Sequence, residues 1–176
     1  MVRQANTNVL EAAWRDRAGF CGVEVLDQPA GSIDLAQRAH LRAVAVRIKI
    51  AHDLLVAFAD EYAPFPGELV AAQTRELVAV RILLQRYGAG DPGTGVEPRL
   101  VTEAETRHDF ERLRARGRAS RSAALRVVAE TLREMVEFLE PVLPGLTAPD
   151  VRNVYLQLCV TSLRQLRVVQ AWSARR

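Results

Sequence analysis

The chain has 176 residues, a length typical of one domain, with 49% hydrophobic residues, 26% charged residues and a formal net charge of +3. This balance predicts a globular protein and argues against a strongly basic nucleic-acid-binding chain. No run of 18 apolar residues and no apolar leader occurs, so we expect no membrane span, no secretory signal and a cytoplasmic location. Aromatic residues are only 6% of the chain, which favours helices over a sheet.

The first 31 residues predict an N-terminal extension, and residues 32–176 predict the folded domain. Thr7 or Asn8 can cap a short helix through Trp14, after which glycines and a proline interrupt any regular pattern. The two cysteines, Cys21 and Cys159, have no CxxC spacing, and we expect both to be buried free thiols.

Two long helices are predicted in the first half of the domain. Ser32 is placed to cap a helix over 33–62, which ends where Pro64 and Pro66 remove backbone donors. A second helix is expected over 68–87, before a glycine-rich loop.

Three further helices are predicted in the second half. Thr102 begins a capping box that opens a short polar helix, expected to lie across the bundle and to end at Gly117. A long helix follows over 120–140. Thr147, with Asp150 three residues later, is placed to open the last helix, which continues to about residue 172.

The lengths of the connections predict the topology. Short loops join the first and second long helices and the third and fourth, so each pair is expected to form an antiparallel hairpin. About 30 residues separate the second long helix from the third. The sequence therefore predicts an all-α protein, a four-helix bundle with one long crossover that contains a short extra helix.

The interior-facing stripes of the four helices are apolar at helical spacing, with five polar exceptions. These are His52, Gln73, Glu76, Ser162 and Gln165. His52 is interpreted as a core histidine with a satisfied hydrogen bond, while His40 and His108 are expected to be solvated.

Several stretches of the chain resemble a bacterial ferritin-like domain family of unknown function. The matching stretches are residues 49–53, 83–88, 91–92, 122–127, 150–155 and 166–167. The resemblance implies a ferritin-like bundle from about residue 41 to 171. It also implies a metal site. However, residues 46–48 stand where the family's first helix has glutamates, and Leu132, Arg133 and Met135 stand where its third helix has acidic residues.

The remaining implied ligand positions hold mostly amides. The family's Glu-x-x-His in the second helix corresponds to Gln73 through Glu76, and a fourth-helix histidine corresponds to Gln165. Only Glu76 is a strong ligand, and His52 adds one more at best, whereas a two-metal centre needs several carboxylates and imidazoles. We therefore expect no cofactor and a polar cluster in which Gln73 and Gln165 donate to Glu76.

Two surface features point to contacts with other molecules. The first helix carries a second apolar stripe, opposite the core, that needs cover from the N-terminal extension or from another subunit: Ala43, Val46, Ile50, Leu54 and Ala57. An arginine-rich segment runs from the second half of the short helix into the long helix after it and is expected to be a solvated face with ion pairs: Arg112, Arg114, Arg116, Arg118, Arg121 and Arg126.

Three functions are compatible with these patterns. The first is a non-catalytic bundle that acts through protein–protein contact, as a homo-oligomer or with another protein. The second is a metal protein with a rearranged site near Glu76 and His52. The third is anion or nucleic-acid binding through Arg112–Arg126, which the modest net charge and scarce aromatic residues disfavour.

Overall fold

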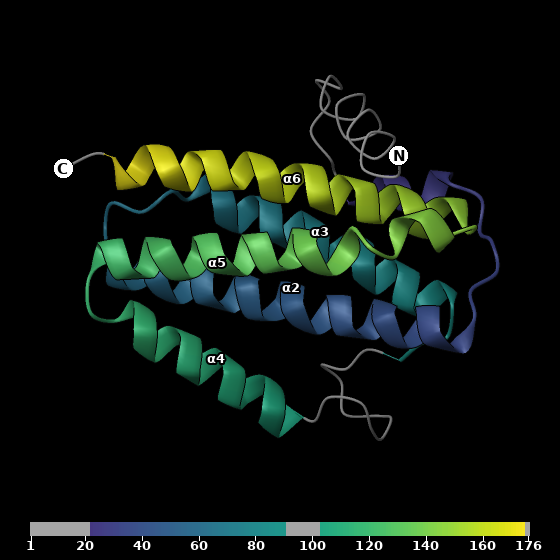
Figure 1. Ribbon diagram of the computed structural model, residues 1–176, viewed down its shortest axis with the longest axis horizontal. Coiled ribbons are helices and arrows are strands. Elements are labelled where there is room, and N and C mark those ends of the chain that lie inside the picture. The colour runs from purple at the N-terminus through teal and green to yellow at the C-terminus, as the bar shows by residue number, and fades with distance from the viewer. Residues whose placement is uncertain (1–21, 91–102, 175–176) are drawn as a thin grey trace.

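The computed structural model describes residues 22–90 and 103–174, in which every regular element is helical (Figure 1). The predicted all-α class is confirmed for this part of the chain. The predicted short helix near Trp14, Cys21 and the capping residue Thr102 lie outside the described residues. The elements are η1 (Val23–Asp27), α2 (Leu35–Glu61), α3 (Glu68–Arg86), α4 (Glu103–Gly117), α5 (Arg121–Leu139), η2 (Leu143–Gly145) and α6 (Pro149–Ser173).

The long helices α2, α3, α5 and α6 lie along the long axis of the molecule, and α4 lies obliquely outside them (Figure 1). Helix α2 packs against α3 and α5, and α6 packs against α5 and α3. The chain reverses direction from α2 to α3 and from α5 to α6, and α4 occupies the long connection between these two hairpins. No helix within the described residues is both long and apolar enough to cross a bilayer.

Two of the predicted helix starts are wrong. Asp34, not Ser32, caps α2, because its carboxylate accepts from the backbone N–H of Gln37 while the Gln37 side chain accepts from the backbone N–H of Asp34. Thr147 is not the N-cap of α6, because the helix begins at Pro149 with Ala148 as its N-cap. Ser120 caps α5 through the backbone N–H of Ala123.

The apolar core consists of two clusters along the bundle. One gathers side chains of the first half of α2, the second half of α3 and the first half of α6, including Ile48, Leu83 and Leu158. The other gathers the opposite ends of these helices with much of α5, including Phe58 and Leu125. Cys159 is a buried free thiol in the first cluster, as predicted.

The second apolar stripe of α2 is covered within the chain, by α4 and α5. Val46, Ile50 and Leu54 are buried and share a cluster with Leu113 of α4, while Ala43 and Ala57 are half-buried. Our expectation that the N-terminal extension or another subunit covers this stripe was wrong. The short helix is polar overall, but Leu113 and the partly buried Phe110 give it an apolar contact with this cluster.

The C-terminal end of α4 is fitted closely to α2. A side chain at Gly117 would place its Cβ 2.2 Å from the ring carbon Cζ of Phe58, which is fully buried. Tyr62 donates from its hydroxyl to the backbone carbonyl of Gly117. The other end of α4 diverges from α2 and α5 (Figure 1).

The described part of the N-terminal extension packs on α3 and α6 instead of on the α2 stripe. Val25 of η1 is buried in the first apolar cluster, and η1 contacts α3 and α6. Gly22 has a positive φ of 84° and lies so close to Arg75 that a Cβ there would be 2.3 Å from its backbone oxygen.

Candidate functional site

A layer of four buried polar side chains crosses the middle of the bundle between α3 and α6. Gln73 and Glu76 come from α3, and Ser162 and Gln165 come from α6, each pair three residues apart and therefore on one helix face. Each is at most 3% exposed. On both helices the layer lies between residues of the two apolar clusters, so it separates them.

Hydrogen bonds join three of the four side chains in a chain. Gln73 donates from Nε2 to Oε1 of Gln165 over 3.0 Å, and Gln165 donates from Nε2 to Oε1 of Glu76 over 3.1 Å. The structure thus brings together the three residues that the sequence grouped. Gln165 donates to the carboxyl group as expected, whereas the amide of Gln73 has its hydrogen bond of 3.0 Å with Gln165.

Two atoms of the layer have no hydrogen-bond partner in the described part of the chain. They are Oε1 of Gln73 and Oγ of Ser162. An unpaired buried polar atom costs about 1–3 kcal/mol. The layer therefore has room for one more donor, and a protonated Glu76 would supply one, since a neutral carboxyl group carries an O–H.

Burial raises the pKa of Glu76 from 4.5 to about 8. The hydrogen bond from Gln165, the charge of Arg75 and the Gln73 amide all oppose this shift, but the loss of water outweighs them. Glu76 is consequently mainly neutral at pH 7. Oε1 of Gln73, one turn away on the same helix, is available to accept a hydrogen bond from its O–H group, because that oxygen has no other partner.

The donor set of this layer does not fit a two-metal carboxylate centre. It offers one carboxyl group with a raised pKa, two amides and a hydroxyl, whereas such centres use several carboxylates and imidazoles. Within residues 22–90 and 103–174, no group of three or more His, Cys, Asp or Glu is arranged to hold a metal ion.

His52 does not join the layer. Its ring nitrogen Nδ1 lies 3.1 Å from Oδ1 of the neighbouring Asp53, whose other oxygen accepts from Lys49 over 2.6 Å. The His52 side chain is 23% exposed, so the expectation of a core histidine was wrong. The His52 side chain lies at the edge of the buried face of α2, and its hydrogen-bond partner is on the same helix.

His40 is half-buried and packs against the core, against our expectation that it is solvated. It stacks on the Phe138 ring at 4.2 Å between centroids, and its Nδ1 lies 3.0 Å from the hydroxyl of Tyr155. Its Nε2 donates to the backbone carbonyl of Phe138 near the end of α5. Because His40 lies four residues before Val44, the helical period could have shown that it faces inward.

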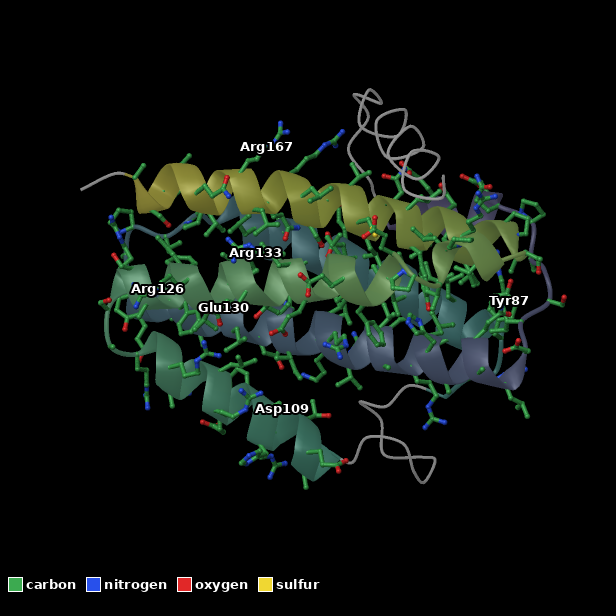
Figure 2. The ribbon with its side chains drawn as sticks, viewed as in Figure 1. Tyr87, Asp109, Arg126, Glu130, Arg133 and Arg167 are labelled. Atoms are coloured by element: carbon green, nitrogen blue, oxygen red, sulfur yellow. The ribbon has the colours of Figure 1, made fainter. Side chains whose placement is uncertain are left out.

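The Asp150 carboxylate is fully buried and connects three segments of the chain. It accepts from Arg86 over 2.8 Å and from the Tyr87 hydroxyl over 2.6 Å. The Tyr87 hydroxyl accepts from the backbone N–H of Gly31, and Arg86 also donates to the backbone carbonyl of Gln28. Figure 2 shows Tyr87 at the end of the bundle. We interpreted Asp150 only as a helix-start residue, and nothing in its spacing indicates these long-range partners.

Acidic side chains pair with three arginines of the arginine-rich segment. Arg112 pairs with Asp109 over 3.0 Å, Arg116 with Glu130 on α5, and Arg118 with Glu61 on α2. Figure 2 marks Asp109 on α4 and Glu130 on α5. His108, on the same helix, is exposed, as expected. These exposed pairs make the segment an ion-paired surface.

No family model matches the chain, and no curated protein matches it either. Its fold is similar to that in the crystal structure of a hypothetical protein from Methanococcus jannaschii, with a TM-score of 0.71 and 21% sequence identity. The likeness covers 82% of this chain and 83% of that one. At this identity it shows a shared helical fold.

Proposed function

We propose that this chain is a ferritin-like four-helix bundle without a metal centre, which acts through contact with another protein or with a second copy of itself. The hydrogen-bonded layer of Gln73, Glu76 and Gln165 is the observation that carries the proposal. Two amides and a carboxyl group are hydrogen-bonded to one another at mid-bundle, where a metalloprotein of this architecture holds its ions.

The connections between the helices support the ferritin-like assignment. Two antiparallel hairpins, α2–α3 and α5–α6, are joined by one long connection that contains α4. A bundle with a single long crossover is the arrangement of that class, and simple up-down-up-down bundles lack it.

Exposed apolar side chains near the N-terminal side support a contact function. Val23 and Leu26 of η1 are 53% and 61% exposed, and Leu35 at the start of α2 is 82% exposed. The other exposed large apolar residues in the described parts, Val56 and Val78, are at 37%. The three most exposed large apolar side chains of the described residues thus lie between residues 23 and 35, and exposed apolar surface of this kind can serve as a contact surface.

Metal analysis of the purified chain tests the absence of a centre. We expect less than about one-tenth of an equivalent of iron, manganese or zinc, before and after a Glu76→Ala substitution. Stoichiometric metal that is lost with this substitution would reverse the proposal in favour of a rearranged site.

Light scattering of the purified chain tests the contact function. If the partner is a second copy of the chain, light scattering should show a dimer or a larger species. The double substitution Leu26→Ser and Leu35→Ser should shift the measured mass toward that of the monomer. Val56→Ser is the matched control and should leave the mass unchanged. A monomer with no partner captured from the host, for both the wild-type chain and the variants, would contradict the contact function.

The arginine-rich segment does not support a second function. Arg112, Arg116 and Arg118 already have carboxylate partners, and phosphate groups would have to compete with them.

A further inference from the structure

A groove of about 310 Å³ opens between α2, α4 and α5. It lies where α4 diverges from the other two helices toward its N-terminal end (Figure 1). Small-molecule sites typically occupy about 300–1,000 Å³ and combine an apolar lining with a few polar groups. The groove is therefore large enough for a molecule with the dimensions of a large amino acid.

The floor of the groove is apolar and comes from all three helices. Val46 and Ile50 of α2, Leu113 of α4 and Met135 of α5 line it, and each is less than one-tenth exposed. Met135 adds a flexible, polarizable side chain that adapts to the shape of a bound apolar group.

The rim of the groove carries two charges of opposite sign that lack an ion-pair partner among the described residues. They are Arg47 of α2 and Glu134 of α5, whereas the other two rim charges, Asp109 and Arg112, neutralise each other over 3.0 Å. The guanidinium carbon of Arg47 lies 4.1 Å from the centre of the Phe138 ring. Stacking on a ring holds a guanidinium group in place and leaves its in-plane N–H donors available.

We propose that this groove binds a zwitterionic small molecule with an apolar body, of which an apolar or aromatic amino acid is the simplest member. The apolar body would occupy the floor, Arg47 would bind the carboxylate, and Glu134 would bind the ammonium group. A purely anionic ligand would be repelled by Glu134, and a purely cationic ligand by Arg47. The pair of rim charges thus selects for a ligand that carries both.

Titration calorimetry with three ligands of one shape tests the proposal: phenylalanine, 3-phenylpropionate and 2-phenylethylamine. We expect phenylalanine to bind about tenfold more tightly than the other two, since it alone satisfies both charges. Arg47→Gln should weaken phenylalanine binding about tenfold and leave 2-phenylethylamine binding no weaker. Glu134→Gln should weaken phenylalanine binding similarly and leave 3-phenylpropionate binding no weaker.

Two sets of variants control for indirect effects. Arg133→Gln and Glu137→Gln change exposed charges of α5 that do not line the groove, and they should not alter binding. Ala43→Leu adds volume at a lining position on a helix that tolerates leucine, and it should abolish binding of all three ligands. A cooperative thermal unfolding transition for each variant would show that its fold is retained.

The proposal is overturned if no ligand binds at millimolar concentration, or if all three bind equally well. It is also overturned if the preference for phenylalanine survives Glu134→Gln, a change at an exposed position that should not disturb folding. None of these results bears on the oligomeric state or metal content, so the contact function is tested separately.

Discussion

The side-chain amide of Gln165 on α6 donates to the carboxyl group of Glu76 on α3 over 3.1 Å, in a region closed to solvent. The hydrogen bond compensates for only part of the solvation that the carboxyl group loses, so burial raises the pKa of Glu76 to about 8. The consequence is that the bundle centre is neutral at pH 7, because the folded chain retains a proton there.

This retained proton predicts that the free energy of unfolding falls as the pH rises. The unfolded chain releases the proton near pH 4.5, whereas the folded chain releases it near pH 8. The stabilisation is complete below the first value and is lost as the pH rises through the second, with a slope of at most about 1.4 kcal/mol per pH unit between them. Chemical unfolding at pH 5 to 9 measures it.

Glu76→Gln should remove this pH dependence and raise the free energy of unfolding at pH 7 by about 1–3 kcal/mol, because the amide has a similar shape and does not have to take up a proton when the chain folds. Glu137→Gln, at an exposed position on α5, is the matched control. A variant that keeps the wild-type slope would show that another group titrates.

His40→Leu should lower the free energy of unfolding by about 1–3 kcal/mol, because the buried hydroxyl of Tyr155 loses its acceptor. Urea unfolding at pH 7.5 measures the loss. His108→Leu, which changes an exposed histidine, is the control. Equal stability of the two variants would contradict the role assigned to His40.

His40 also predicts a loss of stability in acid. Burial lowers its pKa below 6.5, against a hydrogen bond to Phe138 that raises it, and the charge of Arg47 lowers it further. Stability from the neutral ring is present above pH 6.5 and is lost as the pH falls through the depressed pKa of the folded chain. An NMR titration of the His40 ring should give a midpoint below pH 6.5. A midpoint above this value would contradict the burial of the neutral ring.

Gly117→Ala should destabilise the chain by about 1–3 kcal/mol, since the new methyl group would overlap the buried Phe58 ring. Hydrogen exchange should become faster in α4 before it does in α6. Gly67→Ala is the matched control, because a Cβ there meets no atom within 4 Å. Equal effects of the two substitutions would show that α4 is not held by this contact.

Tyr87→Phe should lower the free energy of unfolding by about 1–2 kcal/mol, because it removes the hydroxyl that links Asp150 to the backbone of Gly31. The residues before α2 should then exchange amide protons faster. Tyr62→Phe, which removes one hydrogen bond at the other end of the bundle, is the control. Unchanged exchange near Gly31 would contradict the link.

The sequence by itself determined the helices and the content of the bundle centre. Apolar residues at helical spacing, prolines after α2 and α5, and glycines after α3 and at the end of α4 delimit the elements to within about two residues. Gln73, Glu76 and Gln165 could be grouped because each lies on an inward-facing stripe. These features depend on local preferences and on period, which a single sequence contains.

Only the tertiary structure decided which surfaces meet. The cover of the α2 stripe by α4, the stacking of His40 on Phe138, and the bond between Tyr87 and Asp150 all join residues distant in the chain. So does the groove, because its charges come from separate helices. Such contacts depend on the angle and rotation at which whole helices pack, which the spacing of residues within one helix does not specify.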